Sequence, residues 1–147
     1  MLQEQKAVVV GGTSGIGLAA ATELCRAGAQ VWVTGRTPDK AMGAAAAIGD
    51  RATGHAVDAR DAVKLQDFFA RVGEFDHLIV ALGGGSAIGA FKDLDEVKMR
   101  AGFDNKFWPY LNAIRMGVGQ IRGSGSITLI TGAAGRRAIK APPDSPQ

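Results

Sequence analysis

A glycine-rich stretch near the start of the chain has residue types and a spacing suited to binding phosphate. It reads GGTSGIG, follows a short β-branched run and precedes residues with helical spacing. Glycines at such a turn leave the backbone bare, so a pyrophosphate can approach the N–H groups and the dipole at the start of the helix. The hydroxyls of Thr13 and Ser14 can also donate to phosphate oxygens. We expect a nucleotide-binding turn, rather than a purely structural one, made of Gly11, Thr13, Ser14, Gly15, Ile16 and Gly17.

Arg36 indicates which nucleotide this turn would bind. It ends the next β-branched run, QVWVTGR, and no carboxylate follows until Asp39. A strand at this place delivers an acidic residue to the ribose 2′-hydroxyl when the cofactor is NAD, whereas an arginine accommodates the 2′-phosphate of NADP. A guanidinium grips a phosphate through paired, charge-assisted hydrogen bonds. The sequence therefore predicts NADP as the cofactor, the alternative being a solvated surface arginine.

Short apolar runs that alternate with helical patterns must position these residues. The expected strands cover 6–10, 30–36, a segment ending near Asp58, 76–82 and 126–131, and the expected helices cover 15–27, 39–48, 61–72 (with Asp61 as N-cap) and one or two helices within 94–122. Pro109 predicts a kink or a late helix start in the last of these. Strands alternating with helices predict βαβ units. We expect an α/β fold: a Rossmann-like, doubly wound parallel sheet of about five strands in the order 3-2-1-4-5, in three α/β/α layers.

The composition limits the other functions that the chain could have. Its 147 residues, 46% of them hydrophobic, predict one globular domain, which we expect at 1–135, followed by a basic, proline-rich tail at 136–147. The net charge of +3 comes from scattered basic residues and argues against a nucleic-acid partner. One cysteine and two separated histidines predict no metal site. Neither a signal peptide nor a membrane span is recognisable, so we expect a cytoplasmic protein.

The spacing G-x-x-x-G-x-G in this position resembles the short-chain dehydrogenase/reductase family. Further segments resemble the family in the same order: TGR, VDARD, LIVALGGG, FDNKFW and GSITLITGAAG. The resemblance implies hydride transfer between a nicotinamide cofactor and a carbonyl or hydroxyl substrate. It implies that Asp58 contacts the adenine ring and that Asn105 is the asparagine of the family's catalytic tetrad. It also extends the expected cofactor-binding set to Ala59, Leu82, Gly83 and Gly84.

The family's chemistry also uses a serine and a Tyr-x-x-x-Lys pair, which this chain does not show. Aligned on AAG, the serine position falls on Gly132, and the hydroxyl of Thr131 would face away unless the strand has already ended. Four residues after Tyr110, the one tyrosine, stands Ile114 rather than lysine. We therefore expect a shortened or frame-altered family member with an incomplete catalytic set. Two alternatives stay open: a noncatalytic nucleotide-binding or subunit-interaction module, and an enzyme completed by a partner chain.

The second half of the chain also predicts self-association. In the expected strand order, the strand at 126–131 lies at the edge of the sheet, and an unpaired apolar edge invites pairing with another chain. The preceding helix would expose an apolar patch made of Phe107, Trp108, Leu111 and Met116. We therefore expect a homo-oligomer, most simply a two-fold dimer, against the alternative of a monomer. The substrate stays open.

Overall fold

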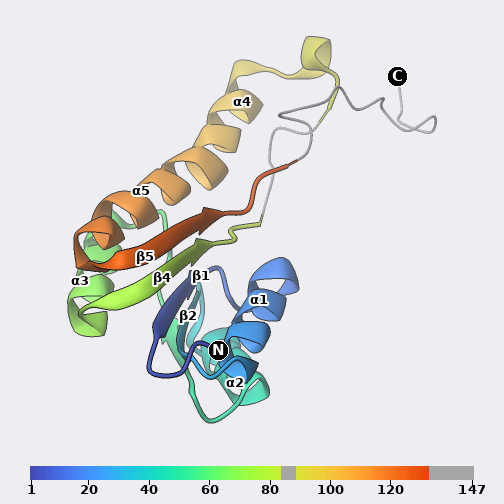
Figure 1. Cartoon of the computed structure of the whole chain (residues 1–147). Helices are drawn as coiled ribbons and strands as arrows, with labels where there is room; N and C mark the ends of the chain where they lie inside the picture. Colours follow the sequence, from blue (N-terminus) through green and yellow to red (C-terminus); the bar gives the residue numbers. More distant parts are fainter. Residues whose placement is uncertain (84–88, 133–147) are drawn as a thin grey trace.

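The sheet has the predicted strands in the predicted order. The computed structural model describes residues 1–83 and 89–132 (Figure 1). Five parallel strands pair in the order β3-β2-β1-β4-β5. They are β1 (Lys6–Val10), β2 (Gln30–Gly35), β3 (Ala52–Ala56), β4 (Phe75–Val80) and β5 (Ile121–Leu129). The Rossmann-like α/β fold predicted from the sequence is confirmed.

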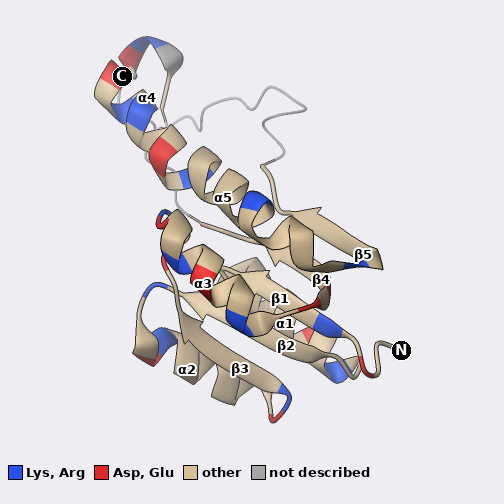
Figure 2. Ribbon diagram, turned by 90° about the vertical axis from the view of Figure 1, so that its left-hand side faces the viewer, with Lys and Arg blue, Asp and Glu red and all other residues tan. Residues whose placement is uncertain are grey.

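Helices cover both faces of the sheet, with α1 and α2 on one side and α3 and α5 on the other (Figure 1). The α-helices are α1 (Gly15–Arg26), α2 (Pro38–Ile48), α3 (Ala62–Val72), α4 (Glu96–Gly102) and α5 (Trp108–Gly117). Short 3-10 segments lie at Phe91–Asp93 and Val118–Gln120. None of the helices in the described part of the chain is both long and apolar enough to span a bilayer. Lys and Arg are spread over several elements in the view of Figure 2.

Alternation along β1 divides the interior into two cores. Val8 and Val10 face the core that α3 and α5 cover. Ala7 and Val9 face the opposite core, covered by α1 and α2. All four side chains are fully buried. Because both faces of β1 are packed, the position of its carboxyl end, where the glycine-rich turn begins, is fixed by the cores on either side.

Pro109 marks the start of a helix, as predicted. It occupies the first turn of α5, and the residues before it, Phe103–Phe107, form a π-helical turn. The Trp108 N–H donates to the Phe103 carbonyl across this wide turn. Proline has no N–H to continue the α-helical pattern, so the irregular turn falls where the proline would interrupt it.

The predicted boundary between the last helix and the last strand was wrong. Instead of continuing to residue 122, α5 ends at Gly117, and β5 begins at Ile121 rather than at Ser126. Ile121 pairs with Phe75 of β4, and the pairing register shifts before His77. This long-range pairing extends the strand across a glycine-rich segment with little strand character of its own. The expected tail, 136–147, lies outside the described residues.

Candidate functional site

A cavity of ≈ 410 Å³ lies where β1, β2, β3 and β4 reach their carboxyl ends. The predicted site residues that line it are Gly11, Thr13, Ser14, Arg36, Asp58, Ala59, Leu82, Gly83 and Asn105. The lining residues that sequence reasoning missed are Thr34, Gly35, Val57, Arg60, Ala81 and Pro109. Most of the missed residues end or directly follow a strand, so the rule that ligands bind at the carboxyl edge of a parallel sheet would have found them. Gly15, Ile16 and Gly17 open α1 without lining this cavity, and Gly84 lies outside the described residues.

The glycines of the turn are each required for a different structural reason. Gly11 and Gly15 have φ values of +87° and +53°, a region that favours glycine. A side chain at Gly11 would also overlap the carbonyl of Ala81 after β4, and one at Gly17 would overlap the carbonyl of Gly11. The Gly11 N–H donates to the buried Thr34 hydroxyl at 3.3 Å. The turn is therefore held close to β2 and β4, with its backbone bare.

The start of α1 offers donors to an anion. Ser14 is the N-cap, and its side chain makes no capping hydrogen bond. The first turn contains no acidic residue that would compete for the helix dipole. Both Ser14 and Thr13 line the cavity. Free N–H groups, two hydroxyls and an uncompensated helix N-terminus together suit a phosphate group.

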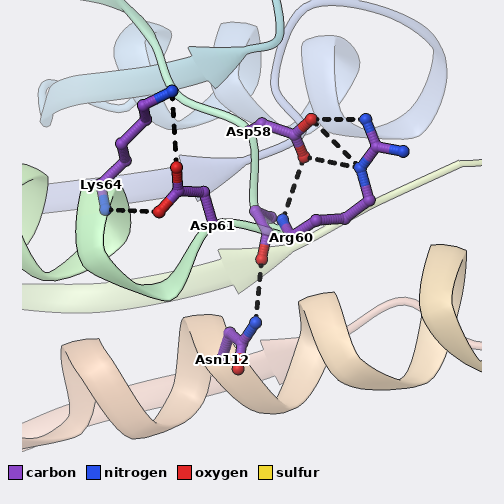
Figure 3. A network of polar contacts seen from close by, with 6 residues as sticks. Asp58, Arg60, Asp61, Lys64 and Asn112 are labelled. Carbon is purple, nitrogen blue, oxygen red and sulfur yellow. Dashed lines mark hydrogen bonds and ion pairs between the residues drawn. The ribbon is translucent and has the colours of Figure 1, made fainter.

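The ion pair of Asp58 and Arg60 lies on the loop after β3 (Figure 3). The closest contact joins Arg60 Nη2 to Asp58 Oδ2 at 2.6 Å. The hydrogen bonds from Arg60 lower the pKa of Asp58, and the nearby charge of Arg36 lowers it further, although burial acts in the opposite direction. Asp58 is therefore a firmly ionised carboxylate whose oxygens already accept hydrogen bonds from a neighbour.

A second cavity, of ≈ 540 Å³, adjoins the first on the side of α2. The two cavities share Thr13, Ser14, Arg36, Asp58 and Arg60. Lys40, on the first turn of α2, also lines the second cavity. Arg36 is exposed and makes no ion pair with any residue in the described part of the chain. Its guanidinium is thus placed to meet an anion from solution.

Asn105 lines the other end of the first cavity, from within the π-helical turn. The next residue, Lys106, turns toward the strand ends: its Nζ donates to the Leu82 carbonyl at 2.6 Å and lies 3.3 Å from the Tyr110 hydroxyl. The Tyr110 hydroxyl donates to the Ile130 carbonyl at 2.6 Å. The single tyrosine is therefore buried and ties α5 to the ends of β4 and β5, outside the lining of the first cavity.

An apolar groove of ≈ 780 Å³ lies beyond Tyr110, between α4, α5 and the end of β5. Phe103 and Phe107, which line it, are 58% and 50% exposed. Thr131 and Gly132 line it as well. Since β5 ends at Leu129, Thr131 is past the strand, and the alternation that would turn its hydroxyl away no longer applies.

The predicted apolar patch is only partly correct. Trp108 is 49% exposed next to Phe107, in agreement with the prediction. Leu111 is half-buried, and Met116 packs against the core beneath α5. Met116 lies three residues after the fully buried Ala113, so ordinary helical spacing places it beside the inner face of α5. The exposed apolar surface therefore lies at the α4 end of this segment.

Comparisons with known proteins agree on one family. A family model described as short chain dehydrogenase matches residues 5–142. The 1-deoxy-11-beta-hydroxypentalenate dehydrogenase of Streptomyces avermitilis is 34% identical over 134 residues, which cover 84% of this chain and 49% of that protein. A short-chain type dehydrogenase/reductase from Mycobacterium ulcerans superposes with a TM-score of 0.86 at 25% identity, covering 94% of this chain and 55% of that one. A short chain dehydrogenase from Burkholderia cenocepacia J2315, in complex with NADP, superposes with a TM-score of 0.83 at 28% identity, covering 95% and 60%. The chain spans about half the length of the curated relative that it matches.

Proposed function

This chain belongs to the short-chain dehydrogenase family, and from this premise we propose that it is the NADP(H)-binding part of an oxidoreductase. The observation that carries the proposal is the cavity that runs from the glycine-rich turn to Asn105 and includes Arg36. Side chains at Gly11 and at Gly35 would fill the space against Ala81 and Thr13, so the bare backbone is what keeps this cradle open.

Each part of the cavity has a role in this proposal. The turn from Gly11 to Gly17 holds the pyrophosphate through backbone N–H groups and the hydroxyls of Thr13 and Ser14. Arg36 binds the 2′-phosphate of the adenosine ribose. Leu82 and Gly83 contact the nicotinamide half, and Asn105 hydrogen-bonds near the reacting groups. The bound cofactor would supply or accept the hydride.

Hydride transfer to a carbonyl also needs groups that transfer a proton, and the family's set of these groups is incomplete in these 147 residues. The family pair Tyr-x-x-x-Lys does not occur in the 147 residues. Tyr110 does not replace it, because its hydroxyl donates to the Ile130 carbonyl and is buried away from the cofactor cavity. We therefore propose that this chain binds the cofactor but does not by itself reduce carbonyl substrates.

Titration calorimetry with NADPH and NADH tests the cofactor assignment. We expect NADPH to bind more tightly by about 1.5–3 kcal/mol, the range for hydrogen bonds to charged groups. Arg36→Ala should remove most of this preference, while Arg26→Ala, an exposed arginine on the far end of α1, serves as the matched control. Equal affinities for the two cofactors, or an unchanged preference in Arg36→Ala, would contradict the proposal.

The apolar groove supports a second candidate, a noncatalytic nucleotide-binding or subunit-interaction module. Phe103, Phe107 and Trp108 are each about half-exposed, and β5 forms the edge of the described sheet. Apolar surface of this kind commonly marks a protein interface. In this proposal the chain forms a homo-oligomer, most simply a dimer. Both candidates predict that the isolated chain binds nucleotide without turnover. Turnover of a carbonyl substrate by this chain together with a partner subunit would favour the oxidoreductase, and no turnover in any assembly would favour the module.

A further inference from the structure

Arg60 is a cation at the cofactor cavity to which the proposed function gives no role. Its guanidinium folds back on Asp58, with Nε 3.1 Å from both carboxylate oxygens and Nη2 2.6 Å from Oδ2. The Arg60 backbone N–H also donates to Oδ1, at 3.0 Å. Each oxygen of Asp58 thus accepts two hydrogen bonds from one residue. The remaining guanidinium nitrogen, Nη1, donates to none of the described residues and points away from the carboxylate (Figure 3).

The loop that carries the ion pair is fixed from two sides (Figure 3). The Asn112 side chain, on α5, donates to the Ala59 carbonyl at 3.3 Å. Asp61 caps α3 by accepting from the Lys64 N–H at 3.0 Å, and its own N–H donates to the Asp58 carbonyl at 3.0 Å. The direction of the half-exposed Arg60 side chain is therefore set by the fold before any ligand binds.

The second cavity gathers three cations and one carboxylate. Arg36, Lys40 and Arg60 bring the positive charges, and Asp58 brings the negative charge. An unpaired carboxylate at this place would repel a phosphate. Because Arg60 binds both oxygens of Asp58, the pair is neutral as a whole and keeps one donor nitrogen for a ligand. The carboxylate also has few acceptor positions left for an adenine amino group.

We propose that Arg60 is a specificity residue for the 2′-phosphate of NADP(H), with Asp58 as the residue that positions it. The inference rests on the proposed function and adds a second arginine to the one expected after β2. A phosphate in the second cavity would meet guanidinium groups from two different loops, whereas the ribose hydroxyl of NAD would gain little from either. Arg60 therefore contributes to the preference between the two cofactors more than to the affinity for both.

Calorimetric titration of Arg60→Ala with NADPH and with NADH tests this role. We expect the Kd for NADPH to rise about tenfold, the effect of losing one charge-assisted hydrogen bond, with a change of about twofold or less for NADH. Arg60→Lys should retain part of the preference. The matched control is Lys64→Ala, which removes an exposed cation from the same region and lines neither cavity. Thermal unfolding of each variant checks that the fold is kept.

Arg60 could act by contacting the phosphate directly or by neutralising the charge of Asp58, and a double variant distinguishes these two effects. If Arg60 acts partly by shielding the carboxylate, adding Asp58→Asn to Arg60→Ala should restore part of the NADPH affinity. An unchanged ratio of NADPH to NADH affinity in Arg60→Ala, or the same change in Lys64→Ala, would overturn the inference while leaving the proposed function standing. If the wild-type chain binds neither cofactor, the proposed function is wrong and this inference falls with it.

Discussion

Replacing Gly17 with alanine tests whether the close packing of α1 sets the geometry of the phosphate-binding turn. Helix propensity alone would make alanine about 0.8–1.0 kcal/mol more favourable than glycine in a helix. At Gly17, however, the new methyl group would overlap the Gly11 carbonyl oxygen and lie 3.2 Å from the Ala81 side chain. Overpacking of this kind costs about 1–3 kcal/mol. The difference between these two terms is a net destabilisation of up to about 2 kcal/mol, and we also expect weaker nucleotide binding because Gly11 must move.

Gly43 provides the matched control, because it lies inside α2 with no atom within 4 Å of an added methyl group. Gly43→Ala should therefore stabilise the protein by up to about 1 kcal/mol. Urea unfolding followed by circular dichroism measures both variants on one scale. If Gly17→Ala proves as stable as Gly43→Ala and binds NADPH like the wild type, the packing argument for the turn is wrong.

We make three further predictions, which concern acid stability, enzymatic activity and self-association. Burial raises the pKa of Asp76, but hydrogen bonds from the Lys6 N–H and the Arg122 side chain outweigh it and lower the pKa overall. The stabilisation from Asp76 is therefore complete above about pH 4 and is lost as the pH falls through the folded pKa, so acid titration should narrow the stability gap between Asp76→Asn and the wild type. Steady-state assays of the isolated chain should show no NADPH-dependent reduction of simple ketones or aldehydes. A saturable rate that Gly15→Asp abolishes would show that the chain has catalytic groups other than those identified here. Light scattering at micromolar concentration should give at least a dimer mass that Phe107→Ser lowers, and a sharp monomer mass for the wild type would refute self-association.

The fold could be predicted largely because its signals are local. The continuous apolar run of β1 and the glycines of the following turn lie between Lys6 and Gly17, and the Asp61 cap lies one residue before α3. The start of β5 could not be predicted, since Ile121 becomes a strand residue only by pairing with Phe75. Helical spacing alone extended the preceding helix across that point.

Likewise, some residues of the candidate site could be predicted from their own segment of sequence, and others could not. Arg36 and the turn could be identified because each follows a strand directly and has a chemical reason in its own segment. Arg60 could not, because its role depends on a side chain that folds back onto Asp58 and on a cavity shared with α2. Tyr110 was recognised as the only tyrosine, but its bond to the Ile130 carbonyl joins residues from two separate elements.

The position of β5 also has a consequence for how the sheet opens over time. β1 has a strand on each side, and its residues Ala7–Val10 are fully buried, so its amide hydrogens should exchange with solvent only when the whole protein unfolds. Among the described residues β5 pairs only with β4, and most of its side chains are exposed, so its outer amides should exchange through small local openings. The Tyr110 hydroxyl holds the strand's far end at Ile130. Local opening of the sheet should therefore begin at the amino end of β5 and stop short of Ile130, which Tyr110 holds.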